Sequence, residues 1–583
     1  MNPHRSAERG SDTQDLESAI SVDADVDVKN SKLGKLTSNK IDDEKDGPGD
    51  SNSTSQSKDQ NEIGSSSHPQ MSSLQFYVAM GSITLAVLLI ALNNTALGTA
   101  IPAITAEFNT VDDIGWYSSA SLIANCVMVP LVGKIYRGFR IKLVFITFII
   151  IFELGSLIAA LSTSSMMLII ARAISGIGGS GIINGSSTIV AATVPIAKRS
   201  FINGIILGCF AVGQAAGPLI GGALTEGLSW RWCFYINLPL GGLVVLLFVF
   251  VVRLPVTRLS EKKTTLVERV LDLDFVGFVI FAAASVLLLV GLQWGGTKYP
   301  WNSPNVIGLM CGGLVAFGVV GFWFAYKGES ALLPPRLLRS RVSIMITITS
   351  FLQSGGSVSS LFWLPIWFQA IRGVNALQSG VMLLPLVLSQ LFASVVCGAL
   401  VQKTGYYLPE VVGGNALVAI GAGLTATFSL ATSDGEIIGY QVLMGAGRGF
   451  VLQLLVLAMQ ANVPREDASI ASAYAMFSQL LGGAIFSALA KTIFTSSIGP
   501  ALHKFAPDID PSLLINTGAT EITKVIPKSQ VKGALLAYNE AINNIFYLQL
   551  AAASCAFLTG WGMGWKNLKH LKQEKEPVEK DGD

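Results

Sequence analysis

Long apolar segments alternate with short polar loops over most of this chain. From about residue 75 to residue 565 these segments are about 20 residues long, enough for a helix to cross about 30 Å of hydrocarbon. About fourteen membrane-spanning helices are predicted, near 77–101, 114–134, 142–161, 166–192, 201–227, 233–252, 274–293, 305–326, 342–369, 376–400, 409–431, 436–460, 467–494 and 541–564. Pro365 predicts a break in the ninth. The pattern predicts an all-α polytopic membrane protein that lies in a lipid bilayer.

Composition agrees with this class and excludes several functions. The chain is 51% apolar and 13% charged, whereas soluble domains carry about 25% charged residues. A net charge of +2 gives no bulk attraction for nucleic acid. The six cysteines lie in or beside apolar segments, which favours small buried side chains over disulfides. The four histidines lie outside the apolar segments, so no intramembrane metal site and no cofactor is expected.

The two ends of the chain differ from the middle. Residues 1–73 are polar, contain no signal-peptide core, and are predicted to form a disordered cytosolic tail. Residues 566–583 are predicted to form a second cytosolic tail. Lys and Arg gather in the loops that this orientation places in the cytosol, whereas the short outer loops hold Arg231, Lys298 and Arg372. A long outer loop is predicted at 495–540, with the choice between a cap and a tether left open.

An internal repeat groups the spans into two sets. Four small or proline residues recur at an offset of 269: Gly176 with Gly445, Gly178 with Gly447, Pro195 with Pro464, and Gly213 with Gly482. The fourth and fifth spans therefore resemble the twelfth and thirteenth, as in transporters with internal duplication. Two six-helix halves are predicted at 74–253 and 341–565, joined by a 254–340 linker that holds two additional central helices.

The stretch GIILGCFAVGQAAGPLIGG (204–222) has two glycine faces. On a helix Gly204, Gly208 and Gly222 lie within about 40° of one another, and a second stripe of Gly213, Gly217 and Gly221 lies roughly opposite. Small residues four apart let helices approach closely in lipid. Pro218 removes one backbone donor and bends the helix. Two interpretations are open: a pivot between two bodies of a membrane protein, or glycine packing common to polytopic proteins.

Several motifs, in chain order, resemble the major facilitator superfamily, and within it the fungal fourteen-span drug:H⁺ antiporter branch. The 204–222 stretch is similar to the fifth-span antiporter motif, whose residues here are Gly204, Gly208, Gly213, Gln214, Gly217, Pro218, Gly221 and Gly222. GKIYRGFRIK (133–142) is similar to the loop after the second span, and LIIARAISGIGGSG (168–181) to the fourth-span motif. Signatures of the branch resemble SWRWCFYINLPLGG (229–242), FELGS (152–156), WLPIWFQ (363–369) and SGVMLLP (379–385). The resemblance implies the major facilitator fold and an efflux transporter rather than an enzyme.

Charged residues inside apolar segments are costly and are candidates for proton coupling: Arg172, Glu153 and Glu226. The resemblance implicates a fourth-span arginine, here Arg172, in coupling, and the alternative is that it binds backbone carbonyls and fixes packing. Glu153 has a similar choice between carrying a proton and bonding a neighbouring helix. Relatives often have an aspartate in the first span, where this chain has Asn93, which carries no proton.

The resemblance also implies a cytosolic gate and a central cargo site. The gate-loop residues are Gly133, Lys134, Arg140 and Lys142, and the acidic residue of the superfamily motif is missing around Tyr136 and Arg137. Cargo is expected near the bilayer midplane between the halves. Mostly neutral polar or aromatic candidates are Asn93, Asn94, Asn184, Gln353, Trp363, Arg448, Gln453 and Tyr474, each of which can instead satisfy a helix contact.

The function predicted first is proton-coupled export of a small amphiphilic molecule, such as a fungal toxin, secondary metabolite or drug, by alternating access. Its partners are the small-molecule substrate and protons. The location predicted is the plasma membrane, with a vacuolar or vesicle membrane as the alternative; a monomer is expected. The alternatives are a siderophore–iron importer, a transporter-like receptor that signals through its tail, and a membrane enzyme. ATP hydrolysis is not expected, because no P-loop pattern is present.

Overall fold

The computed structural model of the chain describes residues 72–108, 113–254, 272–296, 298–511, 514 and 526–568. Most of the two predicted tails, residues 1–71 and 569–583, lie outside these described residues. Within the described ranges the chain is helical, and β-pairing is limited to two isolated bridges. The prediction of an all-α fold is confirmed for this part of the chain.

Seven helices are described in the first half. They are α1 (Ser73–Phe108), α2 (Ile114–Gly138), α3 (Ile141–Ala160), α4 (Ser165–Thr193), α5 (Ile196–Gly227), α6 (Trp232–Tyr235) and α7 (Asn237–Phe250). The helices α6 and α7 share the sixth predicted span and are separated at Ile236. A pair of additional helices follows, α9 (Phe275–Trp294) and α10 (Pro304–Lys327).

The short helix α11 (Arg336–Arg339) leads into the second half. Its helices are α12 (Arg341–Arg372), α13 (Ala376–Met382), α14 (Leu384–Thr404), α15 (Leu408–Thr425), α16 (Asp434–Ala461), α17 (Ala468–Phe505) and α20 (Val531–Gly560). Thirteen helical segments of the described chain are long and apolar enough to cross a membrane, and α12 is not among them. With 32 residues it is also long enough, but its serines and threonines lower its mean hydropathy. Including α12, the number is fourteen.

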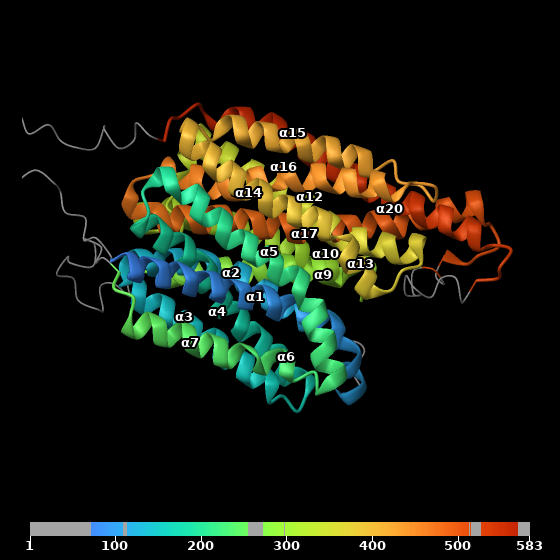
Figure 1. Cartoon of the computed structure of the whole chain (residues 1–583), viewed down its shortest axis with the longest axis horizontal. Coiled ribbons are helices and arrows are strands. Elements are labelled where there is room, and N and C mark those ends of the chain that lie inside the picture. The colour runs from blue at the N-terminus through green and yellow to red at the C-terminus, as the bar shows by residue number, and fades with distance from the viewer. Residues whose placement is uncertain are drawn as a thin grey trace, which may run out of the picture. The chain divides into compact units, whose positions relative to one another are not determined.

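Two local predictions were wrong. The helix α12 continues through Pro365 without a break, since a proline removes only one backbone donor and a packed helix can absorb it. The predicted outer loop 495–540 is helical at both ends, because α17 runs to Phe505 and α20 begins at Val531. These two ends support each other: Lys504 pairs with Glu540 at 2.9 Å, and Gly533 lies against the carbonyl of Phe505. Both helices extend past the others in Figure 1.

Successive long helices alternate in direction, so the loops gather at two ends of the bundle. We call the end at which α1 begins, at Ser73, the tail end, and the opposite end the far end. In Figure 1 the helices of the first half lie below those of the second half, with α5 near the boundary. The most extensive direct contacts between the halves are made by α5 with α14 and by α2 with α17.

The repeated glycines occupy equivalent places in the two halves. Gly176 and Gly178 of α4 press against Ser121 of α2 and Phe152 of α3, respectively. Gly445 and Gly447 of α16 press in the same order against α14 and α15. Gly213 of α5 contacts α1, and Gly482 of α17 contacts α12. Each matched glycine thus admits the corresponding neighbour, which accounts for the spacing of the repeat.

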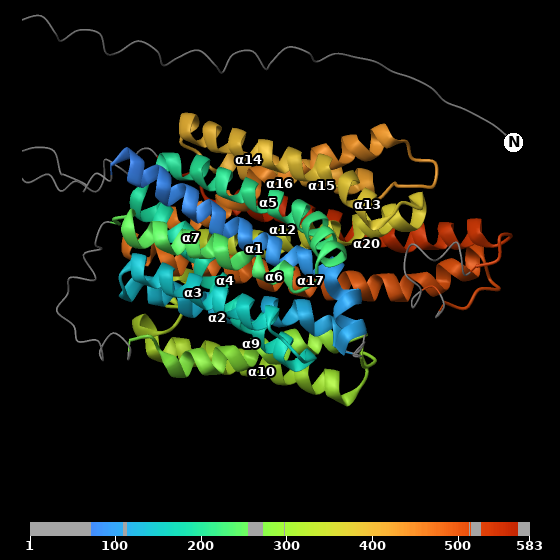
Figure 2. The same cartoon turned by 60° about the horizontal axis from the view of Figure 1, so that its bottom comes forward.

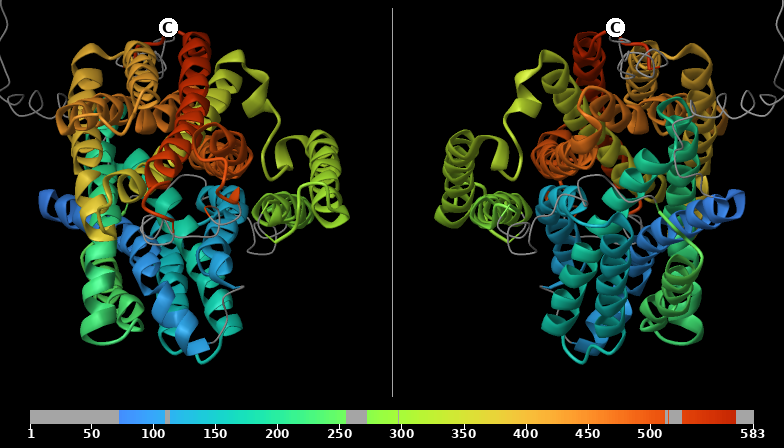
Figure 3. Two further views of the ribbon diagram at one scale, coloured as in Figure 1. Left: turned by 90° about the vertical axis from the view of Figure 1, so that its right-hand side faces the viewer. Right: turned by 90° about the vertical axis from the view of Figure 1, so that its left-hand side faces the viewer.

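The two additional helices form a separate pair at the side of the bundle (Figures 2 and 3). The helix α9 contacts both α2 and α17, so it touches both halves. Phe281 of α9 packs on Phe477 of α17, with ring centroids 4.9 Å apart. Asp274 precedes α9 in a left-handed conformation, and its carboxylate accepts hydrogen bonds from Gly277, Trp323 and Leu332. This carboxylate ties α9, α10 and the segment after α10 into one unit.

The glycine contacts predict opposite effects for two substitutions in α16. A Cβ at Gly445 would lie 2.2 Å from the carbonyl oxygen of Leu386. A Cβ at Gly439 would have no other atom within 4 Å. Gly445→Ala is expected to destabilise the protein by about 1–3 kcal/mol through overpacking. Gly439→Ala is expected to be neutral or to stabilise by about 0.5–1 kcal/mol, because alanine favours the helix. Thermal unfolding in detergent measures both, and equal melting temperatures would contradict the packing.

Candidate functional site

The helix α5 lies between the two halves with small residues on both faces. A Cβ at Gly217 would lie 1.8 Å from Thr95 of α1, and Gly213 and Gly221 face the same helix. On the opposite face a Cβ at Gly204 would lie 2.9 Å from the carbonyl oxygen of Ser394 in α14. Gly208 lies on this second face, against Leu391. The two glycine stripes therefore contact two different helices, one in each half.

The remaining residues of the motif have looser surroundings. Gly222 would meet no atom within 4 Å if it carried a Cβ, so it does not belong to the close contact with α14. Pro218 lies inside α5 and is exposed, and Gln214 is half-buried. Close contacts are thus limited to five of the six glycines, and at Gly208 the neighbour is a side chain, that of Leu391.

A second contact between the halves mirrors the first. A Cβ at Gly133 of α2 would lie 2.6 Å from the Cβ of Ala473 in α17. Ala473 follows Gly204 by 473 − 204 = 269 residues, the offset of the internal repeat. We call these two contacts between the halves the α5–α14 seam and the α2–α17 seam. They are equivalent by the repeat, but the glycine lies on α5 in the first seam and on α2, the partner of α17, in the second. Tyr474 lies next to this seam near the tail end, half-buried, rather than in the middle of its helix.

A network of charged groups joins the halves at the tail end. Asp467, whose side chain is 1% exposed, pairs with Arg137 of α2 at 3.4 Å and also with Arg336. Lys134 donates to the carbonyl oxygen of Ser330 at 2.5 Å, and Glu329 pairs with Arg336 at 3.0 Å. The second half thus supplies an acid to the loop whose own acidic residue is missing, and the segment after α10 completes the network.

The other two gate-loop residues do not reach across the halves. Lys142 donates to the carbonyl oxygens of Val249 and Val252 at 3.1 and 2.8 Å, at the C-terminal end of α7. A cation is stabilised there because the helix dipole is negative at its C-terminus. Arg140 is exposed at the start of α3, and its side chain makes no cap hydrogen bond. Of the four predicted gate-loop residues, Gly133 therefore lies in the seam, and Lys134 reaches the segment after α10.

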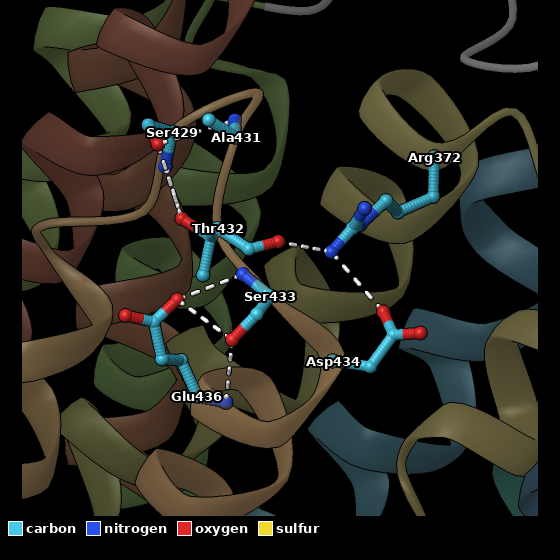
Figure 4. Close-up of polar contacts among 7 residues, drawn as sticks. All are labelled: Arg372, Ser429, Ala431, Thr432, Ser433, Asp434 and Glu436. Atoms are coloured by element: carbon cyan, nitrogen blue, oxygen red, sulfur yellow. Dashed lines mark hydrogen bonds and ion pairs between the residues drawn. The ribbon is translucent and has the colours of Figure 1, made fainter.

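At the far end the ion pairs stay within one half. In the first half Arg231 binds Glu107 at 2.7 Å, and Trp230 donates to the same carboxylate at 2.8 Å. Hydrogen bonds from Arg231 and Trp230 hold the pKa of Glu107 below its usual range. In the second half Arg372 of α12 binds Asp434 and the carbonyl oxygen of Thr432 at the start of α16 (Figure 4).

The side chain of Arg172, on α4, is fully buried and binds neutral groups. Its Nε donates to the carbonyl oxygen of Tyr117 at 2.9 Å, and its Nη atoms donate to the carbonyl oxygen of Asn93 at 3.4 Å and to Oδ1 of Asn94 at 3.1 Å. No carboxylate forms an ion pair with it among the described residues. Arg172 thus joins α4 to α1 and α2.

Asn237, which the sequence reasoning missed, continues this polar group. Its side-chain amide is buried at the start of α7 and donates to Oδ1 of Asn93 at 3.4 Å and to Ser156 of α3 at 3.2 Å. Asn237 lies inside the quoted SWRWCFYINLPLGG motif, so its position in an apolar segment was the available signal. Three helices are connected through this one side chain.

The two candidate glutamates lie in different surroundings. Glu153 is in the middle of α3, and both of its carboxyl oxygens are buried without a hydrogen-bond partner. Its side chain occupies the space above Gly241 of α7, away from both seams. Glu226 is exposed near the far end of α5. Neither glutamate contacts Arg172 directly among the described residues.

Several cargo candidates of the second half have unsatisfied polar atoms. Gln353 of α12 is 3% exposed and its amide has no partner, and Nη1 of Arg448 in α16 has none either. Gln441 of α16, another residue that sequence reasoning missed, is equally unpartnered. It follows Arg172 by 441 − 172 = 269 residues, which was the available signal. Because such groups cost free energy when left unpaired, α12 and α16 offer binding capacity to a polar ligand.

The other candidates are less suited to cargo. Trp363 packs against Phe494 in the core of the second half, with the ring centroids 4.8 Å apart. Asn184 of α4 is fully buried with an unpartnered Nδ2, and Gln453 is half-buried in α16. Within the described ranges no three His, Cys, Asp or Glu side chains come together as a metal site would require.

Comparisons with known proteins identify the family. The family model described as Major Facilitator Superfamily matches residues 83–487. The chain belongs to this superfamily. It is 44% identical to the MFS-type transporter pigP of Monascus ruber, over 88% of this chain and 90% of the relative. It is 41% identical to the MFS-type efflux pump MFS1 of Arthroderma benhamiae, over 86% and 93%, and 37% identical to the efflux pump mlcE of Penicillium citrinum, over 87% and 93%.

A solved structure supports the same fold. The proton:xylose symporter XylE aligns over 86% of this chain and 100% of its own, with a TM-score of 0.55 at 14% identity. At that identity the likeness shows the fold alone. By its family and its relatives the chain is a major facilitator transporter rather than an enzyme, with two six-helix halves and two additional helices between them in the sequence.

The contact between α5 and α1 predicts that Gly217→Leu impairs transport. The leucine would force α5 away from Thr95, at a cost of about 1–3 kcal/mol or more, so transport is expected to fall about fivefold or more while the protein still reaches the membrane. Gly222→Leu is the matched control, because no atom lies within 4 Å of its Cβ position. Dye transport normalised to membrane abundance measures the effect. Undiminished transport in Gly217→Leu would refute a role for this contact.

The tail-end network predicts that Asp467→Asn opens the α2–α17 seam. Loss of the charge-assisted bonds to Arg137 and Arg336 is expected to cost about 1.5 kcal/mol, which corresponds to about tenfold more of the open state. A cysteine at Ser469, buried in this seam, should then react about tenfold faster with a polar maleimide.

Glu329→Gln is the control for this experiment, because Glu329 pairs with the same Arg336 but is exposed, and exposed pairs contribute little. Equal labelling rates in Asp467→Asn and in the parent would show that the network does not hold the seam closed.

Proposed function

We propose that this transporter exports small amphiphilic organic molecules in exchange for protons, by alternating access across the plasma membrane with both termini in the cytosol. The observation that carries the proposal is the place of α5, which has close glycine contacts to α1 of its own half and to α14 of the other. A helix held from both sides can serve as the pivot of a rocking motion. Two of the relatives are efflux pumps, which supports the direction.

The distribution of charged contacts supports alternating access. At the tail end Asp467 holds the halves together, whereas the far-end ion pairs of Glu107 and Arg372 each stay within one half. The halves can therefore separate at the far end without breaking those pairs. With the tail end in the cytosol, this arrangement corresponds to a state that releases cargo outside.

The chemistry of the interior supports neutral cargo and an unusual coupling route. The free polar atoms of Gln353 and Gln441 are amides, which bind hydroxyl, carbonyl or amide groups rather than ions. Proton coupling is assigned to Arg172 and Glu153, since Asn93 and Asn94 cannot carry a proton and Glu226 is exposed. Arg172 acts through the hydrogen bonds that it exchanges with α1 and α2.

The experiment uses the full chain in inside-out membrane vesicles with an acidic lumen. A neutral fluorescent amphiphile is expected to accumulate when the pH gradient is imposed and to stop when a protonophore collapses it. Movement of the amphiphile in the opposite direction, or accumulation that does not depend on the gradient, would refute proton-coupled export.

The same assay tests the assignment of Arg172. Arg172→Ala is expected to remove the stimulation by the pH gradient, because the hydrogen bonds from α4 to α1 and α2 are lost. Arg140→Gln, an exposed arginine at the tail end, is the control and should keep the parent's response. A pH dependence in Arg172→Ala that matches the parent would show that this residue serves packing alone.

A further inference from the structure

A groove between α3 and α7 has one polar group in an apolar wall. Its volume is about 460 Å³, within the range of small-molecule sites. Its apolar lining includes Ile150, Leu154 and Leu157 of α3 and Leu238, Val245 and Leu246 of α7. The polar group is the side chain of Glu153. Leu154 and Leu246 are 49% and 55% exposed, so the groove opens on the outer surface of the bundle, where lipid lies.

The side chain of Glu153 lines this groove, and its carboxyl group is unsatisfied. Both oxygens are buried and have no hydrogen-bond partner among the described residues. Gly241 makes room for the side chain, because a Cβ there would lie 1.7 Å from Oε1. A neutral carboxyl group offers one donor and one acceptor, and in hydrocarbon an unpaired polar group costs several kcal/mol. The arrangement therefore favours a ligand with a matching polar group.

The depth of Glu153 determines which molecules can reach it. The helix α3 has 20 residues, which span about 30 Å, the thickness of the hydrocarbon core. Glu153 lies 153 − 141 = 12 residues from the start of α3, about 18 Å along it and close to the midplane. Lipid head groups stay at the membrane surface, so the partner of this carboxyl must be dissolved in the hydrocarbon.

We propose that the groove between α3 and α7 is a lateral binding site for a membrane-dissolved amphiphile whose hydroxyl or amide group pairs with the Glu153 carboxyl. The inference rests on the proposed function in one respect: such a molecule is the class of cargo assigned above. Ser156 lies three residues after Glu153 on α3, on the same side of the helix. Ser156 accepts a hydrogen bond from Asn237, which also donates to Asn93. The bound polar group thus lies next to the hydrogen-bonded group that contains Arg172.

The test uses the full chain in proteoliposomes and a hydrophobic pyrenyl carbodiimide. The carboxyl proton moves to a carbodiimide nitrogen while a carboxyl oxygen adds to the central carbon, and the O-acylisourea rearranges to a stable N-acylurea. Glu153 is expected to be labelled by this reagent and not by a water-soluble carbodiimide. Glu153→Gln should abolish the labelling, and Glu410→Gln, which removes another carboxyl with a buried oxygen, should leave it unchanged.

Two probes of equal length then separate polar binding from filling by hydrocarbon. Tridecan-7-ol carries its hydroxyl at mid-chain, and tridecane has none. The alcohol is expected to slow labelling about fivefold, as one net hydrogen bond allows, while the alkane slows it less than twofold. Gly242→Phe should remove this protection, because Gly242 lines the groove and a Cβ there meets no atom within 4 Å.

Equal protection by the alkane, or labelling by the water-soluble reagent, would overturn the proposal. Neither measurement requires a pH gradient or transport. Protection by the alcohol in a protein that fails the export assay would therefore refute the proposed function and leave the binding site standing. If the protein exports the amphiphile but the alcohol does not protect Glu153 from labelling, the binding site alone is refuted.

Discussion

The structure depends on the close approach of helix backbones where the two halves meet. In lipid there is no hydrophobic force that pulls one apolar helix onto another, so van der Waals packing and interhelical hydrogen bonds must hold the seams. Gly204 against Ser394 and Gly133 against Ala473 provide that packing. A side chain at either glycine would separate the halves, because backbone atoms cannot move aside as a flexible side chain can.

The two seams are equivalent by the internal repeat but differ in what covers them. Where α5 has Gly208 to admit Leu391 of α14, the matching residue of α17, 477 − 208 = 269 positions on, is Phe477. Phe477 packs on Phe281 of α9, so the additional helices attach to this seam. The segment after α10 then contributes Arg336 to Asp467. The extra pair is therefore part of the contact between the halves at the α2–α17 seam.

Features that depend on local sequence were predictable, and contacts between distant residues were not. The glycine stripes of α5 follow from helical geometry, and the number of spans follows from hydropathy. Asp467 could not be assigned to Arg137, because 330 residues separate them and nothing in the local sequence of either indicates the other. The extent of α17 was missed for a similar reason: its polar end is helical because it packs on α20.

The two halves differ in ionisable chemistry at one equivalent position of the repeat, that of Arg172. In the first half Arg172 binds Asn94 and the backbone of α1 and α2, and Asn237 connects this group to Ser156, near Glu153. In the second half the position equivalent to Arg172 is Gln441, a neutral side chain without a hydrogen-bond partner. A buried guanidinium needs several acceptors wherever it lies, which fixes α4 against its neighbours. An unpartnered amide imposes no such constraint on α16, so this position of the repeat holds a charge in the first half and a neutral polar group in the second, whose buried guanidinium lies elsewhere, at Arg448.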